Sequence, residues 1–321
     1  SQVSIRGSSG YSKGVGSRTL ILVDGIPLLS GDTGEIVFES LPTQYIDRIE
    51  ILKGAASALY GSAAMGGVVN VITKPIPDIP QTNFKAYGGF YGKPYYEAWR
   101  WTDKTQFFNG IYLSHSQSFG DLKSLISLNR TQDDGYRKGS RWQRWNFFTK
   151  NSYQFTESRS LMLSFNYLDQ RRDNFLFWRN IDSALIPPED QIGDRVLSKR
   201  FSLSSHYKDV VSDKFVYNIK SVWYRTNWTD DIETRGNRSI SDYVDAELQF
   251  NYQPIGEHIL TSGADVNFNK VISNLFGDRS RFGGAVYVQD EYKITEDAKA
   301  TLGVRFDAAK LDSLSYDYQL N

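Results

Sequence analysis

Long stretches of alternating apolar and polar residues constrain the fold of this 321-residue chain more than any other feature. Over residues 244–252 the apolar side chains take every second position, and the same period recurs over 300–308. A period of two with one apolar face is typical of a β-strand. Residues 161–167 and 201–207 repeat it, whereas the segments near 107–117 and 283–293 alternate poorly and are assigned by spacing. The chain is therefore predicted to be mostly β.

The connections between the predicted strands alternate between short and long. Tight turns are expected near 119–121, 156–158, 211–213, 254–256 and 295–297, and longer polar links near 93–104, 133–141, 173–197, 230–238 and 273–281. Short turns on one side and long loops on the other are typical of an antiparallel barrel in an outer membrane. The count is about 11 strands of about 10–15 residues, which is long enough to cross a bilayer at a tilt.

Aromatic residues divide the chain into two regions. The chain holds 7 Trp, 20 Tyr and 19 Phe, but only Tyr11, Phe38, Tyr45 and Tyr60 lie within residues 1–74. Prolines in the segment 74–80 block helix and central strand alike. We therefore expect a domain at 1–78 and a second at 79–321.

Aromatic residues near strand ends suit the girdle of a membrane barrel, and Trp142, Trp145, Trp223 and Trp228 have such positions. A barrel that faces lipid outside and water inside also explains why an aromatic-rich chain has a mean hydropathy of −0.45. The alternative is a soluble β-sandwich or β-helix, whose strands are usually shorter, at about 5–6 residues.

Composition excludes several classes of function. The 37 Lys and Arg balance 37 Asp and Glu, which argues against a nucleic-acid partner. The absence of cysteine removes thiolate metal sites and thiol nucleophiles, and the three histidines are too scattered for a metal or haem site. The acidic pairs Asp133-Asp134 and Asp230-Asp231 could bind calcium, but they lack the spacing of a dedicated calcium loop, so solvated acidic loops are the favoured interpretation. We expect no enzyme, no resident metal and no cofactor.

Five blocks within residues 1–74 resemble, in order and spacing, the plug domain of TonB-dependent outer-membrane receptors. They are Ile5-Arg6-Gly7, Leu22-Val23-Asp24-Gly25-Ile26-Pro27, residues 46–54, Ala58-Leu59-Tyr60-Gly61 and residues 66–74. The resemblance implies a small α+β plug inside a 22-stranded transmembrane barrel. With about 11 strands here, we expect the chain to be a fragment that lacks the start of the plug and cannot transport alone.

The same resemblance implies a function and its partners. It implies active uptake of a large, scarce nutrient across the bacterial outer membrane, driven by the TonB energy-transducing complex through a segment missing here. A ferric siderophore is the first choice of ligand and cobalamin the second, with outer-membrane lipid around the barrel. An alternative to uptake is a receptor that only senses its ligand. A soluble β-rich binding module is the third and least favoured function.

Charged plug residues are expected to pair with the inner barrel wall. By resemblance, basic residues at Arg6 and Lys53 meet carboxylates there, although the family usually has Arg where Lys53 stands. Asp24 and Glu50 are interpreted first as turn and strand-edge residues, and second as members of that charge network. The network is assigned to Arg6, Lys53 and Glu50.

Ligand contacts are expected from two places. The plug loops 8–18 and 29–36 are rich in Gly and Ser, so their backbones can approach a ligand closely, and Tyr11, Lys13 and Arg18 offer stacking and charge. The extracellular loops combine aromatic rings with cations, which would suit an anionic chelate, at Trp99, Trp101, Arg137, Arg141, Trp178 and Arg179. The alternative for each is a girdle or lipid-headgroup anchor.

Overall fold

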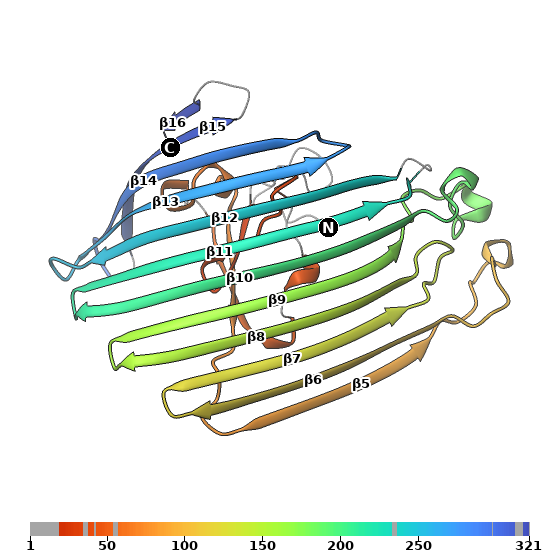
Figure 1. The fold of residues 1–321 in the computed structure, drawn as a ribbon, viewed down its shortest axis with the longest axis horizontal. Coiled ribbons are helices and arrows are strands. Elements are labelled where there is room, and N and C mark those ends of the chain that lie inside the picture. The colour runs from red at the N-terminus through yellow and green to blue at the C-terminus, as the bar shows by residue number, and fades with distance from the viewer. Residues whose placement is uncertain are drawn as a thin grey trace.

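Two β-sheets make up the molecule (Figure 1). The structure is a computed structural model and describes residues 19–34, 38–41, 43–53, 57–232, 236–296, 298–311 and 317–320. A small sheet has the strand order β2 (Ile26–Pro27), β1 (Thr19–Val23), β4 (Gly67–Thr73) and β3 (Ile46–Leu52). In Figure 1 it lies behind a large sheet, near the middle of its strands.

The small sheet has its own apolar core. β1 runs parallel to β4 and antiparallel to β2, and its apolar residues are buried on both faces, as expected for a central strand. Ile21 packs with Val71 on one face, while Leu22 packs with Val68 on the other. Asp24 and Gly25 both have positive φ angles, which allows the tight turn that the sequence predicts between β1 and β2.

Helical segments are short. Helix α1 (Ser57–Tyr60) ends at Gly61, whose φ of 72° stops it, in agreement with the predicted turn of helix. The 3-10 turns are η1 (Phe38–Ser40), η2 (Thr43–Tyr45), η3 (Ser62–Ala64), η4 (Glu97–Trp99), η5 (Ile181–Ser183) and η6 (Glu189–Gln191). No helix within the described ranges is long and apolar enough to cross a membrane.

The large sheet is antiparallel and its strands pair in sequence order. They are β5 (Gln81–Phe90), β6 (Phe107–Phe119), β7 (Leu122–Asp133), β8 (Trp142–Thr156), β9 (Arg159–Asp173), β10 (Arg195–Ser212), β11 (Phe215–Asp230), β12 (Asn237–Tyr252), β13 (His258–Ser273), β14 (Arg279–Lys293), β15 (Lys299–Leu311) and β16 (Asp317–Leu320). The first eleven have 10 to 18 residues, and the short β16 is a twelfth strand that the alternation does not predict.

The connections of the large sheet separate by length, as the sequence predicts. Two residues join β6 to β7, β8 to β9 and β10 to β11, and these turns lie together at the left of Figure 1. The longest links, at 91–106 and 174–194, lie at the opposite end. We call the first the turn end and the second the loop end of the sheet.

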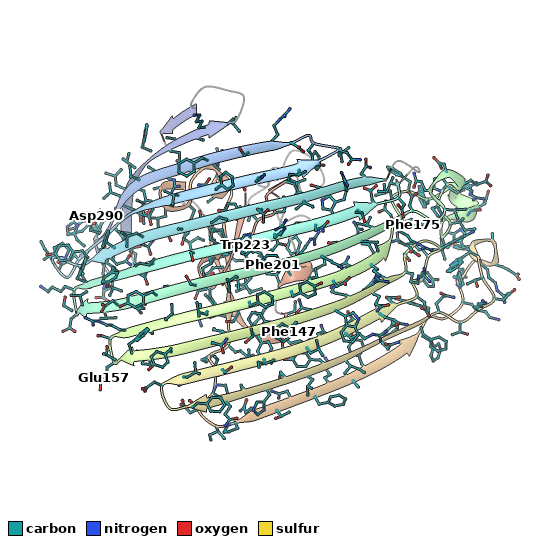
Figure 2. All side chains as sticks on the ribbon, viewed as in Figure 1. Phe147, Glu157, Phe175, Phe201, Trp223 and Asp290 are labelled. Atoms are coloured by element: carbon teal, nitrogen blue, oxygen red, sulfur yellow. The ribbon has the colours of Figure 1, made fainter. Side chains whose placement is uncertain are left out.

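The two faces of the large sheet have reversed polarity compared with a water-soluble sheet. On β15, Leu302 is 79% exposed, whereas Arg305 is only 6% exposed and faces the small sheet. Figure 2 shows Phe147, Phe201 and Trp223 across the face that points away from the small sheet. This outer face carries the apolar residues and the inner face the polar ones, the arrangement of a barrel wall with lipid outside.

Two of the expected girdle residues lie on the inner face instead. Trp142 shares a face of β8 with the buried Phe148 and Lys150, which contact the small sheet. Trp145 and Trp223 are exposed on the outer face, but the indole N–H of Trp228 donates to Asp32 Oδ2 near the small sheet, at 2.9 Å. The predictions for Trp142 and Trp228 were therefore wrong. Strand ends alone do not reveal which face a residue takes, because a shift of one residue reverses the face.

Candidate functional site

The small sheet packs against the inner face of the large sheet through an apolar contact near the turn end. Tyr45 and Ile76, which flank β3 and β4, pack with Tyr112, Leu125 and Phe148 of the large sheet. The ring centroids of Tyr45 and Phe148 lie 6.0 Å apart, within the range of a favourable aromatic pair. This contact is dry and positions the β3–β4 side of the small sheet.

An ionic contact crosses between the sheets at Asp24. The Thr73 hydroxyl donates to Asp24 Oδ2 at 2.6 Å and the Thr73 amide donates to Oδ1 at 2.9 Å. From β8, the Lys150 ammonium donates to the Thr73 hydroxyl at 2.6 Å and lies 3.4 Å from Asp24 Oδ2. Both charged side chains are largely buried, so each needs the other.

A second contact holds helix α1 against β15. The Arg305 Nη1 donates to the backbone carbonyl of Leu59 at 2.9 Å, while Nε donates to Asp307 and Nη2 to Asp265. Two positions away, Gly303 lies so close to α1 that a Cβ added there would stand 2.6 Å from the Ala58 Cβ. The helix therefore fits only where the wall lacks a side chain.

Nearer the loop end the contacts are neutral or mixed. Asp32 accepts hydrogen bonds from Trp228 and, at 3.4 Å, from the Ser239 hydroxyl. The backbone carbonyl of Ser40 accepts a hydrogen bond from the Asn166 amide. Polar contacts thus hold the small sheet to the wall together with apolar ones, which include that of Ile26 and Leu28 with Val222 and Tyr224.

A cavity of about 250 Å³ separates α1 and β2 from strands β11 to β15. Its wall side carries the carboxylates of Asp245, Glu247, Asp265 and Asp307, with the cations of Lys220, Arg281 and Arg305 among them. Tyr60 of α1 borders this cavity. Burial raises the pKa of Tyr60 to about 12, and the nearby negative charge of Glu247 adds to the rise.

Three loops at the loop end pack against one another. The indole N–H of Trp99 donates to the Ile181 carbonyl at 2.7 Å, and that of Trp101 donates to the Tyr136 carbonyl at 3.0 Å. The Arg137 guanidinium lies 4.1 Å from the ring centroid of Phe175. These contacts join the links 91–106, 134–141 and 174–194 into one loop cluster.

A tyrosine anchors the base of the loop cluster. Tyr91 donates from its hydroxyl to Asp133 Oδ2 at 2.8 Å, and its ring packs against those of Phe108 and Tyr136. Burial and the hydrogen bond to Asp133 raise the pKa of Tyr91 to about 12. The neutral phenol therefore persists over the whole physiological range.

Comparison with known proteins identifies the family. Residues 1–68 match the model of the TonB-dependent receptor plug domain. Residues 1–68 belong to the plug-domain family of the TonB-dependent receptors. In the following, the small sheet with its helix is called the plug and the large sheet the wall.

Individual relatives agree with this assignment. The chain is similar to the vitamin B12 transporter BtuB of Vibrio cholerae serotype O1, with 49% identity over 57 residues, which are 18% of this chain and 9% of that protein. Among solved structures it resembles the siderophore receptor PirA from Pseudomonas aeruginosa, with 20% identity and a TM-score of 0.71, covering 94% of this chain and 49% of PirA. The FrpB iron transporter from Neisseria meningitidis gives 13% identity and a TM-score of 0.73 over 96% of this chain and 54% of FrpB.

The chain spans about half the length of the two solved structures, and at these identities the likeness is one of fold. These relatives are transporters and receptors by name, and none is an enzyme.

The structure locates the predicted charge network only in part. Arg6 lies outside the described residues, and Glu50 accepts a hydrogen bond from Arg48 on its own strand, at 2.8 Å. Among the described residues, neither Lys53 nor Glu50 forms an ion pair with the wall. The plug–wall ion pairs among the described residues include Asp24 with Lys150 at 3.4 Å and Glu39 with Arg200 at 3.8 Å. Of these four residues the sequence suggested only Asp24, as a second reading.

The predicted ligand contacts are also distributed unevenly. Tyr11, Lys13 and Arg18 lie outside the described residues. Trp99, Trp101 and Arg137 belong to the loop cluster, and the two indole N–H groups are already engaged there. Arg179 lies 3.5 Å from Glu189, Arg141 lies 3.7 Å from Asp173, and Trp178 is 60% exposed.

Proposed function

We propose that this receptor takes part in TonB-dependent active uptake of a large, scarce nutrient across the bacterial outer membrane. One observation carries the proposal: the plug is held to the wall by a buried ion pair, Asp24 with Lys150, and by the contacts of Arg305. Such contacts are strong when dry and weaken when water enters. Entry of water would therefore help a pull on the plug to release these polar contacts, while the apolar contacts of Tyr45 and Ile76 with the wall have to separate as well. Residues 1–78 form the plug and residues 79–321 the wall in this proposal.

The proposed energy source is the TonB complex, which would act on the plug from the turn end of the wall. The proposed location is the outer membrane, with lipid against the apolar outer face. Uptake by cells that carry the complete protein tests the first point, because it should stop when the proton gradient of the inner membrane is collapsed. Uptake that continues without the gradient would contradict the coupling.

A ferric siderophore is the first candidate ligand. The loop cluster offers aromatic rings beside guanidinium groups at Arg137, Arg141, Trp178 and Arg179, which suit an anionic chelate with planar donor groups. Trp99 and Trp101 would contribute ring faces, and Tyr11, Lys13 and Arg18 would approach from the plug. Several solved structures with this fold are named as siderophore receptors.

Cobalamin is the second candidate, because several sequence relatives are named vitamin B12 transporters. Isothermal titration of the complete protein with a ferric catecholate, a ferric hydroxamate and cyanocobalamin distinguishes the two. Heat with a ferric chelate alone supports the first candidate, and heat with cyanocobalamin alone replaces it with the second. A receptor that binds a ligand without importing it would show heat but no uptake.

A matched pair of tryptophan variants tests the loop cluster. Trp178→Ala should weaken ligand binding about tenfold, because it removes an exposed ring from the loop end. Trp145→Ala removes a similarly exposed ring from the outer face and should leave binding unchanged. Equal effects of the two variants would contradict a ligand site at the loop cluster.

A further inference from the structure

An open hollow of about 510 Å³ lies at the loop end of strands β7 to β10. Four arginines and three aspartates line it, with a tryptophan, two glutamines and Leu197 among them. Neither the plug contacts nor the proposed ligand site needs these groups as a set.

Strand register places the main lining residues on the outer face. Gln143, Arg171 and Leu197 are direct neighbours on β8, β9 and β10. Leu197 is exposed, whereas the next residue, Ser198, is buried on the inner face. Because neighbours in register share a face, Arg171 lies on the outer face beside Leu197.

One step closer to the loops, three further charges stand side by side. The Asp173 amide donates to the Arg141 carbonyl, and Asp173 pairs in register with Arg195. The Asp173 carboxylate lies between the two guanidinium groups, at 3.7 Å from Arg141 and 3.8 Å from Arg195. At these distances Asp173 separates the two cations and leaves most of their N–H groups free for another acceptor.

Arg171 has an even more open guanidinium. It is exposed, and within the described part of the chain its side chain forms neither an ion pair nor a hydrogen bond. Three guanidinium groups, those of Arg141, Arg171 and Arg195, thus line the hollow, and Asp173 lies between the first and the third. The arrangement is suited to an anion with several oxygens, because a guanidinium binds a phosphate with two parallel hydrogen bonds.

The height of the hollow on the wall agrees with a lipid headgroup. Phe147 and Tyr167 are neighbours in the apolar band of the outer face. Arg171 follows Tyr167 by four positions, or about 13 Å along the strand. Between these levels lies Trp145, whose ring stands 5.6 Å from the Arg130 guanidinium, a pair typical of the membrane–water interface. An acyl chain against the apolar band would bring its headgroup to the hollow.

We propose that this hollow binds the phosphate headgroup of a membrane lipid, through the guanidinium groups of Arg141, Arg171 and Arg195. The acyl chains would lie on the apolar band below, near Phe147 and Phe201 (Figure 2). The inference rests on the proposed outer-membrane location. It assigns these arginines to lipid, whereas Arg141 was also a candidate ligand contact.

The test uses native mass spectrometry of the complete protein in detergent micelles that contain either dioleoyl phosphatidic acid or dioleoyl phosphatidylcholine. The wild type should retain phosphatidic acid, and the double variant Arg171→Gln with Arg195→Gln should retain it about tenfold less. The matched control, Arg48→Gln with Lys74→Gln, removes the same charge from exposed plug residues and should behave as wild type. Arg171→Lys keeps the positive charge but loses the two parallel N–H donors of the guanidinium. Its retention of phosphatidic acid should therefore lie between that of the wild type and that of the double variant.

Three results would overturn the proposal. The first is that the wild type and the arginine double variant retain phosphatidic acid equally. The second is that the wild type retains phosphatidylcholine as well as it retains phosphatidic acid. The third is that millimolar inorganic phosphate displaces the bound lipid completely. The last result would mean that the hollow binds free phosphate as well as a lipid headgroup, with no contribution from the acyl chains of the lipid. Cell fractionation tests the proposed location separately, because a protein found outside the outer membrane would contradict it. The experiment in micelles tests only whether the hollow binds the lipid.

Discussion

At the scale of single residues, Lys150 shows how one buried cation of the wall can hold the plug. Its ammonium is nearly inaccessible to water and reaches both Thr73 and Asp24 of the plug. A buried carboxylate that loses its cation keeps the cost of desolvation without the compensating attraction. The stability of the docked plug should therefore depend on this one side chain.

Replacement of Lys150 by methionine should loosen the plug by about 3 kcal/mol. Amide hydrogen exchange in β1 and β4 of the complete protein should then be about 100-fold faster. Lys208→Met is the control, because Lys208 is an exposed lysine on β10. Adding Asp24→Asn to the Lys150 variant should restore part of the protection, and a lack of any restoration would contradict the ion pair.

Tyr60 supplies a pH dependence. Its pKa in the docked plug is raised to about 12, so the folded state favours the neutral phenol over the phenolate. The stability that Tyr60 contributes is complete below the ordinary tyrosine pKa of about 10 and is lost as the pH rises through 12. Hydrogen exchange in α1 should therefore show a loss of stability between about pH 10 and about pH 12, and Tyr60→Phe should abolish this loss. A Tyr91→Phe variant, altered only in the loop cluster, should keep it.

At the scale of elements, docking of helix α1 depends on the absence of a side chain at position 303. Overpacking of a close contact costs about 1–3 kcal/mol, because the neighbouring backbone has to move. In Gly303→Ala, the new methyl group would meet Ala58, so hydrogen exchange in α1 should rise. Gly256→Ala, in a turn with open space around it, should leave exchange in α1 unchanged. Similar exchange in both variants would mean that α1 does not rest on β15.

The elements themselves were predictable where one local rule decides them. Alternation over 244–252 and 300–308 predicted β12 and β15, and Gly61 predicted the end of α1. The plug–wall contacts were not predictable in the same way, since Asp24 and Lys150 are 126 positions apart in sequence. No local pattern pairs such residues, and the resemblance directed attention to Lys53 and Glu50 instead. The signal available in the sequence was a lysine at an inward-facing position of an expected strand.

At the scale of the whole molecule, the reversed polarity of the wall determines which solvent the chain requires. An outer face with large exposed apolar side chains on each strand from β5 to β15 cannot remain in water without association. The inner face is instead occupied by the plug. Lipid on one side and plug on the other therefore satisfy both faces.

The outer face should tolerate charge according to depth. Leu203→Arg places a cation in the middle of β10, beside Phe165 and Trp223, and should cost about 2–4 kcal/mol in a bilayer. Leu197→Arg on the same strand lies near the loop end and should cost about 0–1 kcal/mol. Urea titration of the complete protein folded into lipid vesicles measures both. Equal costs, or a larger cost for Leu197→Arg, would contradict the membrane placement of β10.

The parallel pairing of β1 with β4 has a mechanical consequence. Force applied between the chain before Thr19 and the chain after Thr73 acts on opposite ends of two parallel strands, which are joined over five residue positions from Thr19 and Gly67 to Val23 and Val71. The strands are then loaded in shear, so all their hydrogen bonds resist together instead of opening one after another. Under such a load the plug should move away from the wall as one rigid body before its own sheet unravels.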